Sequence, residues 1–114
     1  DGGHNIGASK SLASWIKQQN QEVHVVVGMM KDKAHKEFVH HLTNFAKSIT
    51  LIDIPNQESS IPKEEFKKKL GDLGDKILLS NDIKDVLIEL SKRKDAICLI
   101  TGSLYLVGEI YNLN

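Results

Sequence analysis

Apolar residues gather in short runs along the chain, separated by longer stretches of mixed character. The runs occupy residues 23–27, 49–54 and 96–101, with a shorter run at 77–79. They are rich in β-branched residues and show little polar alternation, which is typical of strands buried on both faces. This pattern predicts a parallel sheet.

Between these runs, apolar residues recur three and four positions apart, as on one face of a helix. The expected helix faces are Ala8, Leu12, Trp15 and Ile16; Ala34, Phe38, Leu42 and Phe45; Phe66 and Leu70 behind Pro62; Ile83, Val86, Leu87 and Leu90; and Leu104, Val107 and Tyr111 in a last helix. Helices that alternate with buried strands indicate βαβ units. We therefore predict an α/β fold, with a mostly parallel sheet and helices on both faces.

The chain opens with the loop-like residues 1–7 directly before the first helix, and no strand precedes them. In a βαβ unit a strand should lead into that helix. We therefore expect residues 1–114 to form a single domain whose first strand is missing, as a fragment of a longer protein.

Ligands of open α/β sheets bind beyond the carboxyl ends of the strands. In the predicted sheet that edge carries five loops, at residues 1–7, 28–32, 55–61, 80–82 and 101–103. These loops are where a binding site is expected.

Several familiar sites are not encoded here. The chain has no G-x-G-x-x-G loop, no G-x-x-x-x-G-K-[ST] loop and no glycine-flanked nucleophile elbow. Its three clustered histidines, His35, His40 and His41, share one predicted helix without a cysteine or carboxylate at ligand spacing. We therefore expect no metal site within the chain.

The charge balance narrows the possible partners further. Fifteen basic and fifteen acidic residues give no net charge, which argues against a nucleic-acid or anionic membrane surface. No apolar run is long enough to span a bilayer. Cys98 is the only cysteine, so no disulfide can form within the chain, and a cytoplasmic location is expected.

Three stretches on the expected site edge together resemble the C-terminal domain of folylpolyglutamate synthase and dihydrofolate synthase, in the Mur ligase superfamily. They are D-G-G-H-N at residues 1–5, similar to the family's D-G-A-H-N; V-G-M-M-K-D-K at 27–33, similar to G-M-L-x-D-K; and G-S-L-Y-L-V-G-E at 102–109, similar to G-S-L-Y-x-V-G-E. The resemblance implies a Rossmann-like Mur ligase C-terminal domain, and it spans nearly the whole chain.

The resemblance also implies a reaction. The parent protein would be an ATP-dependent ligase that adds L-glutamate to dihydropteroate or to folates through an acyl phosphate. ATP and magnesium would be required, and the P-loop and the magnesium ligands would lie in an N-terminal domain that this fragment lacks. We expect the fragment alone to be inactive, with no catalytic residue of its own, and to be monomeric.

Particular residues match the family's binding positions. The resemblance implies that Asp1 and His4 contact ATP, Asp1 through the ribose hydroxyls. It also implies that Ser103, at the expected start of the last helix, helps to hold the α-carboxylate of L-glutamate, although a plain helix cap remains the alternative. Structural roles in turns or caps are expected for Gly2, Gly3, Asn5, Gly28, Asp32 and Gly102.

The sequence departs from the family in residues 55–61, where many relatives carry a Pro-Arg pair and this chain has no arginine. Two other functions also stay open. One is a domain of a Mur-type peptidoglycan ligase, and the other is a non-catalytic α/β binding module.

Overall fold

The computed structural model describes residues 6–31, 34–54, 58–80, 83–92, 96–102 and 109–112. Along the chain the elements are helix α1 (Ile6–Lys17), strand β1 (Glu22–Gly28), helix α2 (His35–Thr43), strand β2 (Ser48–Leu51), helix α3 (Lys63–Lys69), the 3₁₀ helix η2 (Gly71–Lys76), strand β3 (Leu78–Leu79), helix α4 (Ile83–Ser91) and strands β4 (Ala96–Gly102) and β5 (Glu109–Asn112). Helix and strand alternate as the apolar pattern predicts.

The strands form one sheet in the order β3-β2-β1-β4-β5. Strands β1 to β4 are parallel, and β5 pairs antiparallel with β4. The parallel strands therefore end at one common edge, which we call the carboxyl edge. The predicted α/β class with a mostly parallel sheet is confirmed.

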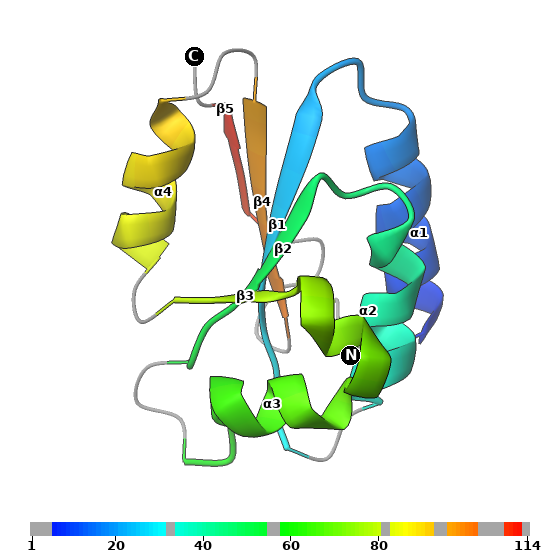
Figure 1. Ribbon diagram of the computed structural model, residues 1–114. Helices are drawn as coiled ribbons and strands as arrows, with labels where there is room; N and C mark the ends of the chain where they lie inside the picture. The colour runs from blue at the N-terminus through cyan, green and yellow to red at the C-terminus, as the bar shows by residue number, and fades with distance from the viewer. Residues whose placement is uncertain are drawn as a thin grey trace.

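Helices cover both faces of the sheet, as Figure 1 shows, with α1 and α2 on one side and α4 on the other. Val25 and Val27 of β1 belong to the larger core, which α1, α2 and α3 close. Val26, between them, belongs to the smaller core under α4. Alternate residues of a strand point to opposite faces, so a continuous apolar run is required here.

The predicted helix faces are largely buried. Leu12 and Ile16 of α1, Phe38 and Leu42 of α2, Phe66 beside Leu70, and Val86 with Leu90 of α4 all lie in the core. Ala34 and Phe45 are exceptions: α2 runs from His35 to Thr43, so both residues lie beyond its ends, where Ala34 is exposed and the Phe45 side chain is 42% exposed. Strand β2 is also shorter than its apolar run, since it ends at Leu51, opposite the last residue of β3.

The predicted last helix is wrong where it includes Tyr111. Tyr111 lies in β5, opposite Cys98 of β4. An unpaired β4 edge would leave its backbone N–H and C=O groups without partners, and β5 satisfies them on the side away from β1. Leu104 and Val107 lie outside the described residues.

Candidate ligand site at the carboxyl edge

The two central strands end side by side at the carboxyl edge. Gly28, the last residue of β1, lies directly opposite Gly102, the last residue of β4. This confirms that the loops after the first and last predicted parallel strands are neighbours in space. Each loop belongs to one of the stretches that carry the family resemblance.

Gly28 lies where a side chain would have little room. A Cβ atom at this position would lie 2.9 Å from Cγ1 of Ile54, in the segment that leaves β2. Among the described glycines only Gly71, after α3, has a positive φ. The turn role expected for Gly28 stays a prediction, and the lack of room for a side chain is a separate finding.

Backbone hydrogen bonds join the loop after β1 to the segment before α3. Met30 and Ser60 form an antiparallel bridge. The N–H of Lys31 donates to the carbonyl of Ser59 at 2.8 Å, and the N–H of Ile61 donates to the carbonyl of Met29 at 2.9 Å. Two of the five loops expected at this edge are therefore held together.

Asp53 and Lys63 close the base of the loop that follows β2. The Asp53 carboxylate accepts the backbone N–H of Lys63 at 2.8 Å and its Nζ at 3.0 Å, so it caps the first turn of α3. Burial acts to raise the pKa of Asp53, but the hydrogen bonds and the charge of Lys63 outweigh it and lower that pKa overall. The hydrogen bonds to Asp53 and then to Glu64 raise the pKa of Lys63.

Sequence reasoning missed this pair. Asp53 stands inside the apolar run 49–54, which was interpreted as a strand throughout. A carboxylate in a run of isoleucine and leucine was the available signal, because a charged group there needs a partner or an exit from the sheet.

His35 fixes the same loop from the start of α2. Its side chain is buried, and Nε2 lies 2.7 Å from the carbonyl oxygen of Met30, so Nε2 carries the proton of that hydrogen bond. The ring packs against Phe66 with 5.0 Å between centroids. The buried histidine of α2 thus has a structural role, while His40 is exposed and His41 is partly buried.

Thr101 ends the buried part of β4, one residue before Gly102. Its hydroxyl oxygen is buried and has no hydrogen-bond partner among the described residues. Buried hydroxyls nearly always have such partners. This polar group sits beside the stretch that begins at Gly102.

The three residues expected to bind ligands, Asp1, His4 and Ser103, lie outside the described residues. So do four residues expected to have turn or cap roles, namely Gly2, Gly3, Asn5 and Asp32. Of the named site residues, the structure places Gly28 and the backbone of Gly102, and it brings those two together.

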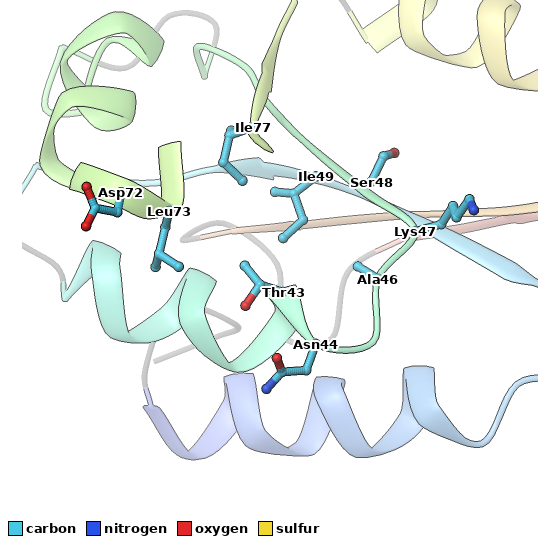
Figure 2. Close-up of a pocket in the computed structure, with 9 residues that line it drawn as sticks. All are labelled: Thr43, Asn44, Ala46, Lys47, Ser48, Ile49, Asp72, Leu73 and Ile77. Carbon is cyan, nitrogen blue, oxygen red and sulfur yellow. The ribbon is translucent and has the colours of Figure 1, made fainter. Parts of the chain in front are cut away.

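No group of three or more histidine, cysteine, aspartate or glutamate side chains that could hold a metal ion occurs within the described part of the chain. A cavity of ≈ 340 Å³, drawn in Figure 2, lies between the end of α2, the start of β2 and η2. Its wall includes Asn44, Ser48 and Asp72. It adjoins the amino end of β2 and so is separate from the carboxyl edge.

A parallel sheet covered on both faces, with glycine-ended strands meeting at its carboxyl edge, defines an α/β domain of the doubly wound, ligand-binding kind. The chain belongs to the Mur ligase, glutamate ligase domain family, whose model matches residues 1–104. The resemblance to folylpolyglutamate synthase deduced from the sequence is thereby confirmed.

Individual relatives agree with this assignment. A dihydrofolate synthase/folylpolyglutamate synthase from Bacillus subtilis is 32% identical over 114 residues, a match that covers 96% of this chain and 26% of that protein. The bifunctional folylpolyglutamate synthase/dihydrofolate synthase from Yersinia pestis was solved with AMPPNP and manganese, and its structure matches with a TM-score of 0.69 at 18% identity. The match covers 94% of this chain and 26% of the Yersinia chain. A bifunctional enzyme solved with manganese, AMPPNP and L-glutamate has a TM-score of 0.71 at 18% identity, with the same coverage.

The chain spans about a quarter of the length of these relatives. The two solved structures confirm the fold. Within the described residues, no helix combines the length and the apolar character needed to cross a membrane.

Proposed function

We propose that this chain is the nucleotide- and glutamate-binding domain of an ATP-dependent ligase that adds L-glutamate to dihydropteroate, to folates or to both. The observation that carries the proposal is the meeting of Gly28 and Gly102 at the carboxyl edge. Two of the three stretches that resemble the ligase family thereby lie together at the edge where such sheets bind ligands.

The chemistry requires activation of a carboxylate. The substrate carboxylate attacks the γ-phosphorus of ATP, and ADP leaves as an acyl phosphate forms. The amine of L-glutamate then attacks the acyl carbon, phosphate leaves, and the amine gives up a proton to yield the amide. Binding sites that hold the three reactants in register supply much of the rate increase.

In this proposal the residues of the chain bind and orient. The Asp1 carboxylate accepts hydrogen bonds from the ribose hydroxyls of ATP, and His4 contacts the same nucleotide. The Ser103 hydroxyl donates to the α-carboxylate of L-glutamate.

The proposal places the divalent metal outside this chain. Two relatives were solved with manganese and AMPPNP. The described residues offer no cluster of ligands for such an ion. We assign the metal ligands and the P-loop to another domain of a longer protein.

A crossed kinetic experiment in the complete ligase tests the proposal. Asp1→Ala should raise the KM for ATP and leave the KM for L-glutamate nearly unchanged, because it removes a charged hydrogen bond to the nucleotide. Losing such a bond costs about 1.5–3 kcal/mol, roughly ten- to a hundredfold in affinity. Ser103→Ala should do the converse and raise the glutamate KM several-fold.

Ser91→Ala is the matched control, since Ser91 lies at the end of α4 and its hydroxyl bonds to the carbonyl of Ile88. It should change neither KM. If Asp1→Ala and Ser103→Ala both fold normally and keep wild-type KM values, these residues have only turn and cap roles, and the proposed site is wrong.

A further inference from the structure

The hydroxyl of Thr101 is a buried polar group that the described residues leave without a hydrogen-bond partner. The residue is 1% exposed, so water does not supply the missing bond from the surface. Buried hydroxyls nearly always have a partner, because an unpaired one carries the full cost of its desolvation. The position therefore indicates a partner from outside the described residues.

The Thr101 side chain points to the face of the sheet that α1 and α2 cover. Alternate residues of a strand point to opposite faces. Leu99, two residues earlier in β4, belongs to the larger core, whereas Ile100 belongs to the smaller core under α4. Val27, the neighbour of Thr101 in β1, also belongs to the larger core. The side chains of Val27 and Leu99 are apolar and cannot bond to the hydroxyl.

Helix α1 begins on the same face and at the same edge as Thr101. It lies directly before β1 in the chain, so it runs from the carboxyl edge back to the amino edge. Its 12 residues extend about 18 Å, and the 7 residues of β1 extend about 23 Å, so the helix covers most of the strand. Figure 1 shows the start of α1 toward the end of the molecule where β1 and β4 finish. The opening stretch, residues 1–5, leads into α1 at this end.

The chain that follows β4 is the other possible source of a partner. It returns as β5, which pairs with β4 on the side away from β1. That side is an edge of the sheet, whereas Thr101 points to the face that α1 covers. The direction of the side chain therefore favours the opening stretch.

We propose that the Thr101 hydroxyl forms a hydrogen bond with the opening stretch and thereby holds the Asp1 carboxylate in position for the ribose of ATP. Thr101 is then a positioning residue, since it acts through Asp1 and touches no substrate itself. The ligand in this inference rests on the proposed function. The strand alone requires only a β-branched residue at position 101, which valine would satisfy, so the hydroxyl is the feature that the inference explains.

Backbone amide NMR signals of the 114-residue chain test the contact. Thr101→Val keeps the shape of the side chain and removes the hydroxyl, so it should shift the amide signals of residues 2–5. Thr101→Ser keeps the hydroxyl and should leave those signals near their wild-type positions. Thr50→Val is the matched control, because Thr50 is buried in β2 beside Val26 of the smaller core, on the opposite face. It should not move the signals of residues 2–5.

Kinetics of the complete ligase test the positioning role. Thr101→Val should raise the KM for ATP by about two- to tenfold, the effect of one neutral hydrogen bond, and change the KM for L-glutamate by less than about twofold. In an Asp1→Ala background the same substitution should have almost no further effect, because the group that it positions is already gone. Thr101→Ser should restore the KM for ATP, and Thr50→Val should leave it unchanged.

Three results would overturn the inference. The first is a Thr101→Val chain whose amide signals at residues 2–5 stay in place. The second is a shift confined to residues 103–108, which would identify the partner in the stretch after β4. The third is an effect of Thr101→Val on the KM for ATP that is equally large with and without Asp1.

The NMR result is separable from the test of the proposed function, because it requires no ligase activity. If Asp1→Ala raises the KM for ATP while Thr101→Val changes neither the signals nor the KM, only the inference about Thr101 is wrong. If Thr101→Val shifts the signals as expected while Asp1→Ala leaves the KM for ATP unchanged, the contact stands and the proposed role of Asp1 is wrong.

Discussion

At the scale of single residues, Cys98 is a thiol that the fold makes unreactive. It lies in β4, fully buried in the smaller core under α4, and burial raises its pKa to about 11. Only the thiolate is a good nucleophile. We expect iodoacetamide at pH 8 to leave the native chain unmodified and to label it after denaturation in urea, as mass spectrometry would measure. Rapid labelling of the native chain would contradict this.

The same shift makes part of the stability depend on pH. The folded-state pKa of Cys98 lies above its ordinary value of 9.0, so the protonated thiol favours the folded chain. That contribution is complete below pH 9 and is lost as the pH rises through about 11. The Cys98→Ala variant has no thiol to titrate. The difference in free energy of unfolding between the wild-type chain and this variant should therefore shift against the wild type by up to about 3 kcal/mol over this pH range. Urea unfolding of both chains at pH 8 and pH 10.5 measures this shift. If the difference in free energy of unfolding is the same at both pH values, the thiol does not contribute as expected.

How far the site could be predicted also varies from residue to residue. A sequence alone cannot show that a Cβ atom at position 28 would lie 2.9 Å from Cγ1 of Ile54. Sequence reasoning overlooked Asp53, because the partner Lys63 is ten positions away and only the fold brings them together. The proposed roles of Asp1, His4 and Ser103 come from resemblance alone and stay predictions.

At the scale of elements, the bond from Asp53 to the first residue of α3 joins a strand exit to a helix start. Asp53→Ala removes the cap of that helix and the partner of Lys63. We expect it to lower the free energy of unfolding by about 1 kcal/mol, the usual cost of a lost cap. Asp53→Asn should cost less, since the amide oxygen can still accept the Lys63 N–H. Urea unfolding at pH 7 measures both variants.

At acid pH, the wild-type chain and Asp53→Ala should have nearly the same free energy of unfolding. The pKa of Asp53 is lowered in the folded chain, so its contribution is present above the ordinary value of 3.8 and disappears as the pH falls through the folded-state pKa. Glu64→Gln serves as the control, because Glu64 reaches the same ammonium at 3.2 Å from a side chain that is 64% exposed. It should have little effect at either pH. If Asp53→Ala lowers the free energy of unfolding by the same amount in acid, the charge of the Asp53 carboxylate does not contribute to stability.

Elements with strong periodicity were predictable, and those set by neighbours were not. The apolar faces of α1, α2 and α4 and the runs that became β1 and β4 follow directly from residue spacing. The end of β2 at Leu51 depends on where β3 stops, which the run itself does not encode. Tyr111 fitted a helical spacing with Leu104 and Val107, but the open edge of β4 makes an antiparallel strand the better partner.

At the scale of the whole molecule, the proposed function assigns binding to this chain and phosphate transfer to another domain. The sheet offers one carboxyl edge, where Gly28 and Gly102 meet. The chain contains no G-x-x-x-x-G-K-[ST] sequence to cradle a triphosphate. Its described residues hold no cluster of metal ligands. In the proposed function, the parts that transfer phosphate belong to another domain.

We accordingly expect the purified 114-residue chain to have no ligase activity. Incubated with ATP, magnesium, L-glutamate and either dihydropteroate or tetrahydrofolate, it should release no ADP that depends on glutamate, because its sequence has no P-loop to hold the γ-phosphate in line with a carboxylate. Activity should appear when the chain is joined to the P-loop domain of its parent, and in that protein Asp1→Ala should reduce it. Glutamate-dependent ADP release by the chain alone would mean that it contains a phosphate-binding site of its own, and the division of labour proposed here would be wrong.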